Sequence, residues 1–411
     1  MTQQKCRFCG TLLKYSFCDL GTSPPSNAFL SEKQLDDTEI FYPLHAKVCE
    51  LCFLVQLPQY QSPAEIFHEY LYFSSYSKSW VNHVKQYANH AAKRFKLNPS
   101  TQVIEIASND GYLLQHFKAR GIPILGVEPA ENVAAAAKEK GIPTRVGFFG
   151  IEMARAMREE GLSADLLIAN NVLAHVPDLH DFVAGLKLLL KPSGRLTLEF
   201  PHIQELIDKN QFDTIYHEHF SYFSLLTAAR IFSKHGLKIY DVERLDTHGG
   251  SLRIYLSHAE DQTALISEAV LSLRREEMAV GLNKIETYAA FSKKVEECRL
   301  EFLAFLISLR YDGKTIAAYG APAKGNTLLN YCGIRPDLLP YTVDQNPHKQ
   351  GRFLPGSRIP VYAPDKIKET KPDYLLILPW NLKEEIMEQM SYIRAWHGRF
   401  VVPIPRIQVF S

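Results

Sequence analysis

The clearest pattern in the chain is the segment Gln102-Val-Ile-Glu-Ile-Ala-Ser-Asn-Asp-Gly111, in which an apolar run passes directly into a short polar loop. The run predicts a buried β-strand followed by a tight turn. Residues 112–120 then have the pattern of a helix, which ends at Gly121. A second predicted strand, 123–128, ends in the acidic residue Glu128. A strand, a loop, a helix and a second strand in this order are typical of an α/β domain with a parallel sheet.

Strands and helices continue to alternate around this unit. A helix is expected over 76–95, another over 132–140, a strand over 164–170, and further elements through 186–190 and 195–200. The alternation predicts a Rossmann-like sheet that binds its ligand at the carboxyl ends of its strands. Glu128 stands at the distance along the chain where such folds carry an acid for ribose hydroxyls.

The loop after the first strand limits the choice of ligand. Gly111 is the only glycine in this loop, so the Gly-x-Gly-x-x-Gly pattern of dinucleotide-binding loops is missing. Glu105, Asn109 and Asp110 instead suit a ligand that carries an ammonium and a sulfonium group. The structural alternative is a strand-turn-helix unit that binds no cofactor. We favour a sulfonium methyl donor.

Two Cys-x-x-Cys pairs stand near the start of the chain, Cys6 with Cys9 and Cys49 with Cys52. Two thiolates at this spacing reach one ion from a tight turn, and two such turns complete a tetrahedral zinc site without an open position. The apolar residues nearby make only a small core, which bound Zn²⁺ would stabilise. We therefore expect structural zinc, with catalytic zinc or metal-free thiols as alternatives. The remaining cysteines are expected to be ordinary thiols: Cys18, Cys298 and Cys332.

Composition excludes several classes of partner. The chain has 411 residues, which suggests two to three domains, and its 46 basic and 45 acidic residues give a formal net charge of +1. This balance favours neither nucleic acid nor a membrane as a partner. No signal-like apolar run is evident, and the odd number of cysteines argues for a reducing compartment. We expect a cytoplasmic protein that is a monomer or a weak homo-oligomer.

Four motifs occur in order: Ser108-Asn109-Asp110-Gly111, Gly126-Val-Glu-Pro-Ala130, Asn170-Asn-Val-Leu-Ala-His175 and Tyr216-His-Glu-His219. Together they resemble the sugar C-methyltransferases that act at C-3 of thymidine-diphosphate 4-keto-deoxysugars. The first loop resembles motif I of class I S-adenosylmethionine-dependent methyltransferases, although Ala107 stands where that motif has its first glycine. The likeness covers almost the whole chain, from the cysteine pairs to Gly320-Ala-Pro-Ala-Lys-Gly325 and Asp344-Gln-Asn-Pro347.

This resemblance implies three domains: a zinc-binding domain over 1–70, a Rossmann-like methyltransferase domain over 71–257, and a second Rossmann-like domain over 258–411. The nucleotide-sugar is expected between the last two. The residues expected to contact S-adenosylmethionine are Glu105, Ser108, Asn109, Asp110, Gly111, Glu128, Pro129 and Asn170. Those expected to contact the nucleotide-sugar are Tyr70, Tyr76, His175, Tyr216, His248, Ala321, Lys324 and Asn326.

Proton-transfer groups are concentrated in Tyr216-His217-Glu218-His219, a run that is costly to bury without a task. The implied chemistry removes a proton from C-3, which the neighbouring ketone makes acidic, so it needs a base and a donor to the enolate oxygen. His219 is our first choice as the base, because an imidazole titrates near neutral pH. Tyr216 is expected to donate to the sugar oxygen, or to be the base itself. Glu218 is expected to orient His219 or another sugar contact.

The same run has other interpretations. His-x-His could hold iron, although no third ligand is identifiable, or the four residues could form a structural polar cluster. His217 and His219 share a face if the segment is extended, whereas near-helical geometry separates them. His175 follows the strand 164–170 at the edge where ligands bind, so we expect it to act in catalysis, whereas His202 is expected to be structural.

The other candidate sugar contacts also have structural alternatives. Tyr70 and Tyr76 either supply hydroxyls to the ligand or pack between domains. Thr247-His-Gly-Gly-Ser-Leu-Arg253 is either a hairpin turn or a close approach to a ligand. A helical stretch over 260–310 and strands over 315–319, 341–344 and 374–378 are expected after it. Between them Gly320–Asn326, with Lys324 at a helix start, either cradles a pyrophosphate or forms a structural turn.

Two other classes of function compete. A nicotinamide oxidoreductase or epimerase of nucleotide sugars needs a glycine-rich dinucleotide loop and usually a Tyr-x-x-x-Lys pair, and neither is evident. A zinc-ribbon interaction protein with an inactive methyltransferase fold predicts the loss of proton-transfer groups, yet Tyr216, Glu218 and His219 are all present.

Overall fold

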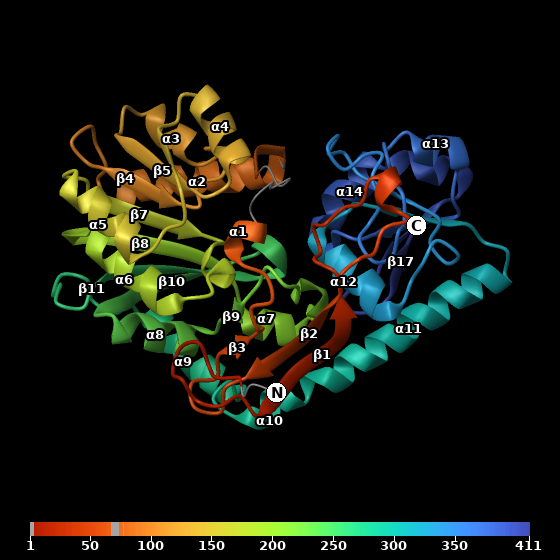
Figure 1. Ribbon diagram of the computed structural model, residues 1–411, viewed down its shortest axis with the longest axis horizontal. Helices are drawn as coiled ribbons and strands as arrows, with labels where there is room; N and C mark the ends of the chain where they lie inside the picture. Colours follow the sequence, from red (N-terminus) through yellow and green to blue (C-terminus); the bar gives the residue numbers. More distant parts are fainter. Residues whose placement is uncertain (1–3, 67–73, 77) are drawn as a thin grey trace.

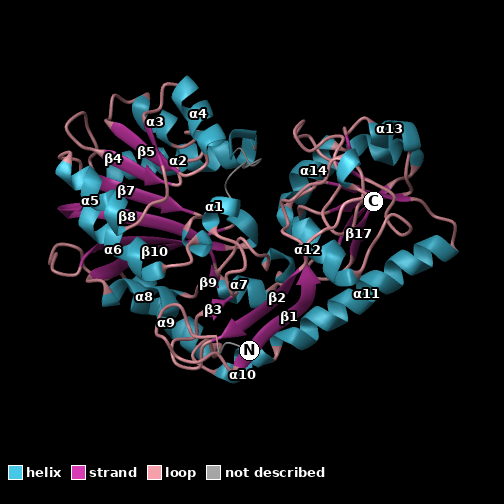
Figure 2. Cartoon of the chain, in the orientation of Figure 1, coloured by secondary structure: helices cyan, strands magenta, loops and turns pink. Residues whose placement is uncertain are grey.

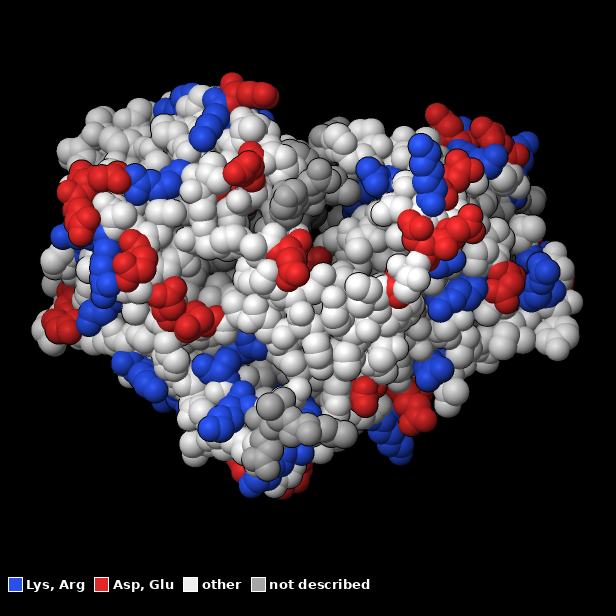
Figure 3. All heavy atoms as spheres, viewed as in Figure 1, with Lys and Arg blue, Asp and Glu red and all other residues white. Residues whose placement is uncertain are grey.

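The computed structural model describes residues 4–66, 74–76 and 78–411. The chain forms two lobes that are connected by a small sheet and a long helix (Figure 1). The face seen in Figure 3 is hollowed between the lobes and carries charged side chains of both signs. Within the described ranges, no helix combines the length and the apolar character needed to cross a membrane.

The first lobe contains a seven-stranded sheet in the order β10-β11-β8-β7-β4-β5-β6. Strands β4 to β8 run parallel, which confirms the predicted α/β sheet, and β11 and β10 add an antiparallel hairpin at one edge. The segment 247–253 is the turn of this hairpin and the start of β11. The strands are β4 (Val103–Ile106), β5 (Ile124–Glu128), β6 (Thr144–Val146), β7 (Ala164–Asn170), β8 (Leu190–Pro201), β10 (Leu237–Leu245) and β11 (Ser251–His258).

Helices cover both faces of this sheet, which explains why apolar residues of its central strands are buried on both sides. Leu166 and Ile168 of β7 pack with α2 and α3, whereas Leu167 and Ala169 pack with α5, α6 and α8. Residues 186–189 complete α6, and residues 112–113 form a turn instead of the first turn of the predicted helix. The helices are α2 (Lys78–Arg94), α3 (Leu114–Lys118), α4 (Glu131–Glu139), α5 (Ile151–Glu159), α6 (Leu179–Leu189), α7 (Ile203–Asp208) and α8 (Leu225–Lys234).

The second lobe contains a six-stranded sheet in the order β14-β13-β12-β15-β16-β17, parallel except for β17. Its first five strands therefore follow the same spatial order around β12 as β6-β5-β4-β7-β8 follow around β4. The strands are β12 (Ile316–Tyr319), β13 (Thr342–Val343), β14 (Val361–Tyr362), β15 (Tyr374–Ile377), β16 (Arg399–Val402) and β17 (Gln408–Phe410). The helices are α12 (Ala323–Cys332), α13 (Lys366–Thr370) and α14 (Lys383–Gln389).

Three helices connect the lobes. The predicted helical stretch over 260–310 is confirmed in most of its length, but turns divide it into α9 (Glu268–Ala279), α10 (Ile285–Ala289) and α11 (Phe291–Tyr311). Glu277 of α9 accepts the backbone N–H groups of Leu225 and Leu226 at the start of α8, at 2.6 and 2.8 Å. Helix α9 is therefore attached to the first lobe, while α11 extends to the second (Figure 1). The predicted domain boundaries at 70 and 257 stay predictions.

The N-terminal segment packs on both lobes. Its strands β1 (Tyr15–Ser23), β2 (Tyr42–Val48) and β3 (Val55–Gln56) form a sheet with β9 (Ser221–Tyr222), which begins two residues after His219. Phe17 and Leu20 of β1 share a core with α11 and the second sheet, whereas Phe8 and Leu54 beside the cysteines share one with the first sheet. Figure 2 shows β1 and β2 between the lobes. The short helix α1 (Pro63–Ile66) follows β3.

Candidate active site

The four cysteines predicted to bind zinc converge on one point. The sulfur atoms of Cys6, Cys9, Cys49 and Cys52 all lie within 4.8 Å of one another, and three of their separations are 3.4 to 3.7 Å. Sulfurs at about 2.3 Å from a tetrahedral zinc ion stand roughly 3.8 Å apart, so the cluster fits this metal. Gln56 donates to Cys6 Sγ at 3.2 Å, a contact that supports a thiolate ligand. Cys18, Cys298 and Cys332 are buried elsewhere.

Arg7 lies between Cys6 and Cys9 and links the cysteine cluster to the segments that carry His175 and His219. Its Nη1 donates to the Pro177 carbonyl oxygen at 3.0 Å, and its guanidinium carbon lies 5.4 Å from the centre of the Phe220 ring. Burial lowers the pKa of Arg7 to about 10. Phe220 follows His219 directly and Pro177 lies two residues beyond His175. Through Arg7, the cysteine cluster therefore contacts the segments that carry His175 and His219.

The polar loop after β4 has a strained backbone. Ala107 and Asn109 adopt φ of +57° and +47°, a region that non-glycine residues rarely occupy. A Cβ atom on Gly126 of β5 would lie 2.3 Å from Ser108 Oγ, so a glycine is required for the loop to pack against this strand. The loop is thus held at the carboxyl edge of the sheet in one strained conformation, as is common at binding sites.

Four carboxyl groups gather at this edge. Glu105 is 1% exposed, and no described residue forms a hydrogen bond with either of its oxygens. Burial, together with the charges of Glu128, Asp110 and Glu199, raises the pKa of Glu105 well above its ordinary value. Such a group is costly unless it is protonated or faces a cation. The arrangement fits a methyl donor that carries ammonium and sulfonium charges.

Glu128 is held at the end of β5 by backbone groups. Its carboxylate accepts the N–H of Asn109 at 3.0 Å and that of Ala130 at 2.9 Å, with Pro129 in the turn between β5 and α4. Burial raises the pKa of Glu128 to about 7, although the two N–H groups lower it. Each oxygen keeps a second lone pair, so the carboxylate can still accept from ribose hydroxyls.

Further polar groups of the predicted cofactor site are buried without a hydrogen-bond partner among the described residues. They are both side-chain polar atoms of Asn170, Ser108 Oγ and Asp110 Oδ1. The other oxygen of Asp110 is engaged, because it accepts from Lys140 Nζ at 2.8 Å and from the Ser75 hydroxyl. Unsatisfied buried groups are rare in proteins unless a ligand completes them. The residues around β4, β5 and β7 therefore fit S-adenosylmethionine.

The run Tyr216–His219, which is predicted to be catalytic, forms a single turn. The His219 N–H donates to the Tyr216 carbonyl oxygen at 2.9 Å, so the segment is neither the extended strand nor the helix considered from sequence. This turn places the side chains of its first and last residues together, with Tyr216 Oη 2.9 Å from His219 Nε2. His219 Nδ1 lies 2.9 Å from the Thr214 carbonyl oxygen, which assigns the ring proton to Nδ1. Tyr216 therefore donates to Nε2.

His219 is a neutral imidazole in this setting. Burial, followed by the nearby His175, His248 and Lys324, lowers its pKa well below the ordinary value, although the Thr214 carbonyl raises it. The His175 ring lies 4.8 Å from that of His219 in an edge-on arrangement, and burial lowers the pKa of His175 to about 4. A neutral ring is the form that can accept a proton.

The middle residues of the turn point to other parts of the chain. His217 Nε2 lies 3.2 Å from the carbonyl oxygen of Pro43 in β2. In the described ranges, the four cysteines are the only group of His, Cys, Asp or Glu suited to share a metal ion, which leaves the iron hypothesis without support. Glu218 does not contact the His219 ring as one hypothesis expected; its Oε1 accepts from Asn27 Nδ2 at 2.6 Å. Burial raises the pKa of Glu218 to about 7.

The second lobe contributes a buried cation at the same place. Lys324 Nζ lies 4.3 Å from the centre of the Trp380 ring and donates to Asn381 Oδ1. Trp380 Nε1 donates to Asp213 Oδ2 at 2.6 Å, just before the catalytic turn. Burial lowers the pKa of Lys324 to about 8, while Asp213 raises it. The lobes are therefore joined by polar contacts beside His219.

The hairpin tip between β10 and β11 completes this junction. His248 adopts φ of +54°, and its ring lies 5.1 Å from that of Trp80 on α2. Burial lowers the pKa of His248 to about 4, helped by the charge of Lys324. A Cβ atom on Gly249 would lie 2.5 Å from the Trp380 ring, so the glycine permits the close approach of the lobes. The segment forms the hairpin turn considered from sequence, and its glycine lies close to Trp380 of the second lobe; its approach to a ligand stays a prediction.

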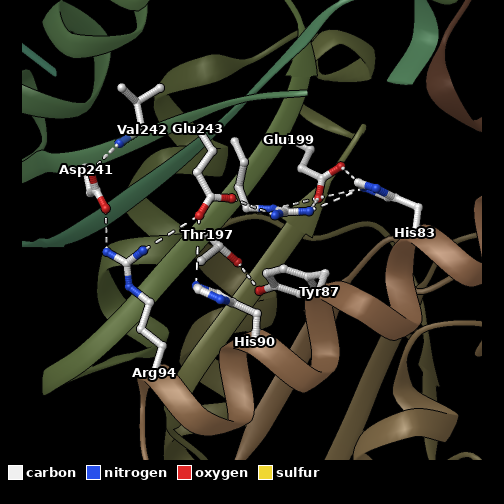
Figure 4. Close-up of polar contacts among 10 residues, drawn as sticks. His83, Tyr87, His90, Arg94, Thr197, Glu199, Asp241, Val242 and Glu243 are labelled. Atoms are coloured by element: carbon white, nitrogen blue, oxygen red, sulfur yellow. Dashed lines mark hydrogen bonds and ion pairs between the residues drawn. The ribbon is translucent and has the colours of Figure 1, made fainter. Parts of the chain in front are cut away.

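Helix α2 directs a row of polar side chains at the first sheet (Figure 4): His83, Tyr87, His90 and Arg94. Buried Glu199 of β8 accepts from Arg253 Nε at 2.8 Å, and its second oxygen lies 3.1 Å from His83 Nε2. Burial would raise the pKa of Glu199, but His83 and Arg253 bring it below its ordinary value. Glu199 pairs with Asn170 in the sheet, so this network fixes a negative charge at the cofactor edge.

Other predicted sugar contacts are engaged within the protein. The Ala321 N–H donates to Asp344 Oδ2 at 2.7 Å, and Asn326 Nδ2 donates to the Ser26 carbonyl oxygen at 2.6 Å. Tyr70 lies outside the described residues, as does the side chain of Tyr76. His202 is buried and lies 2.7 Å from Glu277, in agreement with a structural role.

Several residues of the site were missed from sequence. Glu199 could have been found, because a carboxylate inside the apolar strand 195–200 needs a partner or a task. Asn27, Arg7 and Lys349 have no local signal, since each acts on a segment more than a hundred residues away.

Comparisons with known proteins agree with this architecture. Three family models match successive parts of the chain: a zinc binding domain over residues 6–67, a methyltransferase domain over 80–242, and a C-methyltransferase C-terminal domain over 246–405. The C-methyltransferase NovU of Streptomyces niveus is 35% identical over 407 residues, which cover 99% of this chain and 97% of that protein.

Two similar solved structures each cover less than half of this chain. The PH0226 protein of Pyrococcus horikoshii OT3 is 16% identical and covers 47% of this chain and 98% of its own, with a TM-score of 0.38. Magnesium protoporphyrin IX methyltransferase of Synechocystis PCC 6803, with bound SAH, is 16% identical and covers 43% of this chain and 83% of its own, with a TM-score of 0.35. At these TM-scores neither likeness supports a conclusion about this chain.

Proposed function

The chain belongs to the S-adenosylmethionine-dependent C-methyltransferases, and we propose that it methylates C-3 of a thymidine-diphosphate-linked 4-keto-6-deoxysugar. S-adenosylmethionine, held at the edge of β4, β5 and β7, supplies the methyl group, and the four cysteines hold a structural zinc ion. The sugar substrate is supported by the four ordered motifs, which resemble those of sugar C-methyltransferases. The product would be a branched deoxysugar.

The observation that carries this proposal is the hydrogen bond from Tyr216 to His219 Nε2. A donor and a base that are 2.9 Å apart match a carbonyl oxygen and the hydrogen on the neighbouring carbon of one substrate. Tyr216 transfers its hydrogen bond from Nε2 to the C-4 oxygen when the sugar binds. Nε2 then has a free lone pair that takes the C-3 proton, while Tyr216 stabilises the enolate oxygen. Thr214 holds the opposite side of the ring throughout.

Lys324 gives the nucleotide part of the substrate a role in catalysis. Its charge is one of the causes that lower the pKa of His219, so it weakens the base in the free enzyme. Phosphates of the nucleotide-sugar would neutralise this charge, because Lys324 lies at the junction of the lobes with Trp380 and Asn381. The imidazole therefore becomes a stronger base only when the substrate is bound.

Isotope exchange tests the proposal. The protein is incubated with thymidine-diphosphate 4-keto-6-deoxysugars in deuterated water, with adenosylhomocysteine in place of the methyl donor. We expect deuterium to enter C-3, and we expect one added methyl group by mass spectrometry when S-adenosylmethionine is supplied. Absence of both signals in folded protein that binds S-adenosylmethionine would exclude this substrate class.

A further inference from the structure

Glu218 lies inside the catalytic turn, but its carboxylate is held by the N-terminal segment. Asn27 Nδ2 donates to Glu218 Oε1 at 2.6 Å and so joins residues that are 191 positions apart. No described residue donates a hydrogen bond to the other oxygen, Oε2. The side chain is nevertheless buried, with 5% of its residue surface exposed. One oxygen is thus fixed and the other can accept from a ligand.

The loop that carries Asn27 is held against the second lobe by hydrogen bonds. The Ser26 carbonyl oxygen accepts from Asn326, and Leu30 exchanges two backbone hydrogen bonds with Phe353, at 3.0 and 2.8 Å. Phe29 lies against Lys349, whose Nζ is 5.3 Å from the centre of its ring. The position of Asn27 is therefore set by contacts that do not involve Glu218.

Lys349 adds a charge to this arrangement. Its Nζ donates to the Ala321 carbonyl oxygen at 2.8 Å. Burial lowers the pKa of Lys349, while Asp344 and Glu218 raise it. The same cation lowers the pKa of Glu218, against the effect of burial. Residues from the N-terminal segment and the second lobe thus both act on a carboxylate of the first lobe.

A merely structural contact is a poor explanation for this carboxylate. The loop already has the backbone bonds at Leu30 and the bond to Asn326, so it needs no further attachment. Burying a carboxylate costs more than one neutral donor returns, and an apolar residue would serve better as a spacer. Among the described residues, none donates a hydrogen bond to the second oxygen of Glu218, so this oxygen is available to accept one from a ligand.

We propose that Asn27 is a positioning residue of the active site, which fixes Glu218 so that its second oxygen accepts from a hydroxyl group of the sugar. This inference rests on the proposed function, because the partner is a substrate hydroxyl. It makes the metal-binding N-terminal segment a part of the substrate site. The Asn27→Leu variant removes the donor, keeps the number and branching of the side-chain heavy atoms and adds no charge.

The test compares Asn27→Leu with Glu218→Gln, with the double variant and with a matched control. The control is Glu39→Gln, which weakens another contact of the same segment with the second lobe, at Gly356, and does not touch Glu218. We expect Asn27→Leu to raise KM for the nucleotide-sugar and to lower kcat/KM by roughly tenfold to a hundredfold, as for a lost bond to a charged group. Its calorimetric affinity for S-adenosylmethionine and its Tm should equal those of the control.

The double variant separates positioning from stability. If Asn27 acts through Glu218, adding Asn27→Leu to Glu218→Gln produces little further loss. Losses that multiply, or a lower Tm with unchanged kinetics, would overturn the role of Asn27 and leave the proposed function intact. A wild-type enzyme inactive on every nucleotide-linked 4-keto sugar would overturn the proposed function and the hydroxyl contact together.

Discussion

Tyr216 Oη lies 2.9 Å from His219 Nε2, and both groups belong to one four-residue turn. The phenol donates and the imidazole accepts, because Nδ1 is used by the Thr214 carbonyl oxygen. In the free enzyme the lone pair of the proposed base is thus occupied by the residue expected to stabilise the enolate. In the proposed mechanism, substrate binding moves the Tyr216 hydrogen bond from Nε2 to the C-4 oxygen, which assigns different roles to the two side chains.

The variants His219→Asn and Tyr216→Phe should separate these roles. His219→Asn should suppress both deuterium entry at C-3 and methyl transfer by roughly 10²–10⁴-fold, the usual contribution of a general base. Tyr216→Phe should retain some exchange but lose roughly 10²–10³-fold in methyl transfer, because the enolate oxygen loses its donor. Exchange and turnover are measured on the same sample by mass spectrometry. Exchange that survives in His219→Asn would make Tyr216 the base.

Binding of S-adenosylmethionine should release protons. Burial and the neighbouring carboxylates raise the pKa of Glu105 well above its ordinary value in the ligand-free protein, so its carboxyl group keeps its proton to a higher pH than an exposed glutamate does. A cationic ligand favours the carboxylate, so a proton leaves on binding and affinity rises with pH until Glu105 is ionised without ligand. Calorimetry in buffers of different ionisation enthalpy measures this release. Adenosylhomocysteine, which lacks the sulfonium, should release less, and an unchanged release in Glu105→Gln would contradict the assignment.

Removal of zinc should abolish turnover but spare the binding of the methyl donor. The cysteine cluster supports β3, which pairs with β9 two residues after His219, and Arg7 contacts Phe220. The cofactor edge consists of β4, β5 and β7, which carry none of these contacts. Chelation, or Cys49→Ser, is followed by circular dichroism, by turnover and by calorimetry with S-adenosylmethionine. Loss of donor affinity alone, with turnover kept at saturating donor, would argue against a structural zinc.

Asp213 should make the stability of the protein depend on pH. Burial raises its folded pKa to about 6 from an ordinary value of 3.8, although Lys324 and Trp380 lower it. A raised carboxyl pKa favours the folded state at low pH, and this contribution is lost as pH rises through about 6. The side chain introduced by Asp213→Asn is neutral at every pH. The variant should therefore have a larger free energy of unfolding than wild type, and this difference should grow between pH 4 and 6 to about 3 kcal/mol. Urea unfolding at several pH values measures it, and an advantage that shrinks with pH would contradict the prediction.

Gly249→Ala should weaken substrate binding at the junction of the lobes, in addition to the loss of stability that its backbone strain causes. The new methyl group would lie 2.5 Å from the Trp380 ring, next to Lys324. Gly313→Ala is the matched control, since Gly313 also has a positive φ (+64°) but nothing within 4 Å of its Cβ position. Both variants should lose about 1 kcal/mol of stability from the backbone. Only Gly249→Ala should also raise KM for the nucleotide-sugar severalfold, and equal kinetics in both would refute the expectation.

The central sheet was predictable because its information is local. The apolar run 103–106 and the alternation after it require a buried parallel strand whichever way the lobes pack. The zinc cluster was predictable for the same reason, since two short spacings each bring two sulfurs together. The division of the helical stretch 260–310 into three helices was missed, because composition alone does not show where a chain turns between lobes.

The individual contacts of the site required the fold. The four titratable residues 216–219 are adjacent in sequence, yet a turn sends Tyr216 and His219 to one place, His217 to β2 and Glu218 to Asn27. No periodicity predicts this division, because a turn places side chains by its own geometry. Sequence also favoured His219 as the base without showing that its lone pair is occupied.

The amino-acid sequence alone determined the class of fold, the metal cluster and the edge of the sheet that holds the methyl donor, because each depends on residues a few positions apart. The tertiary structure decided which groups come together at the proposed active site. Asn27 reaches Glu218 across 191 residues, and Lys324 approaches His219 from the second lobe. Such contacts depend on how the two lobes and the N-terminal segment pack together, and packing sums many weak interactions over the whole chain.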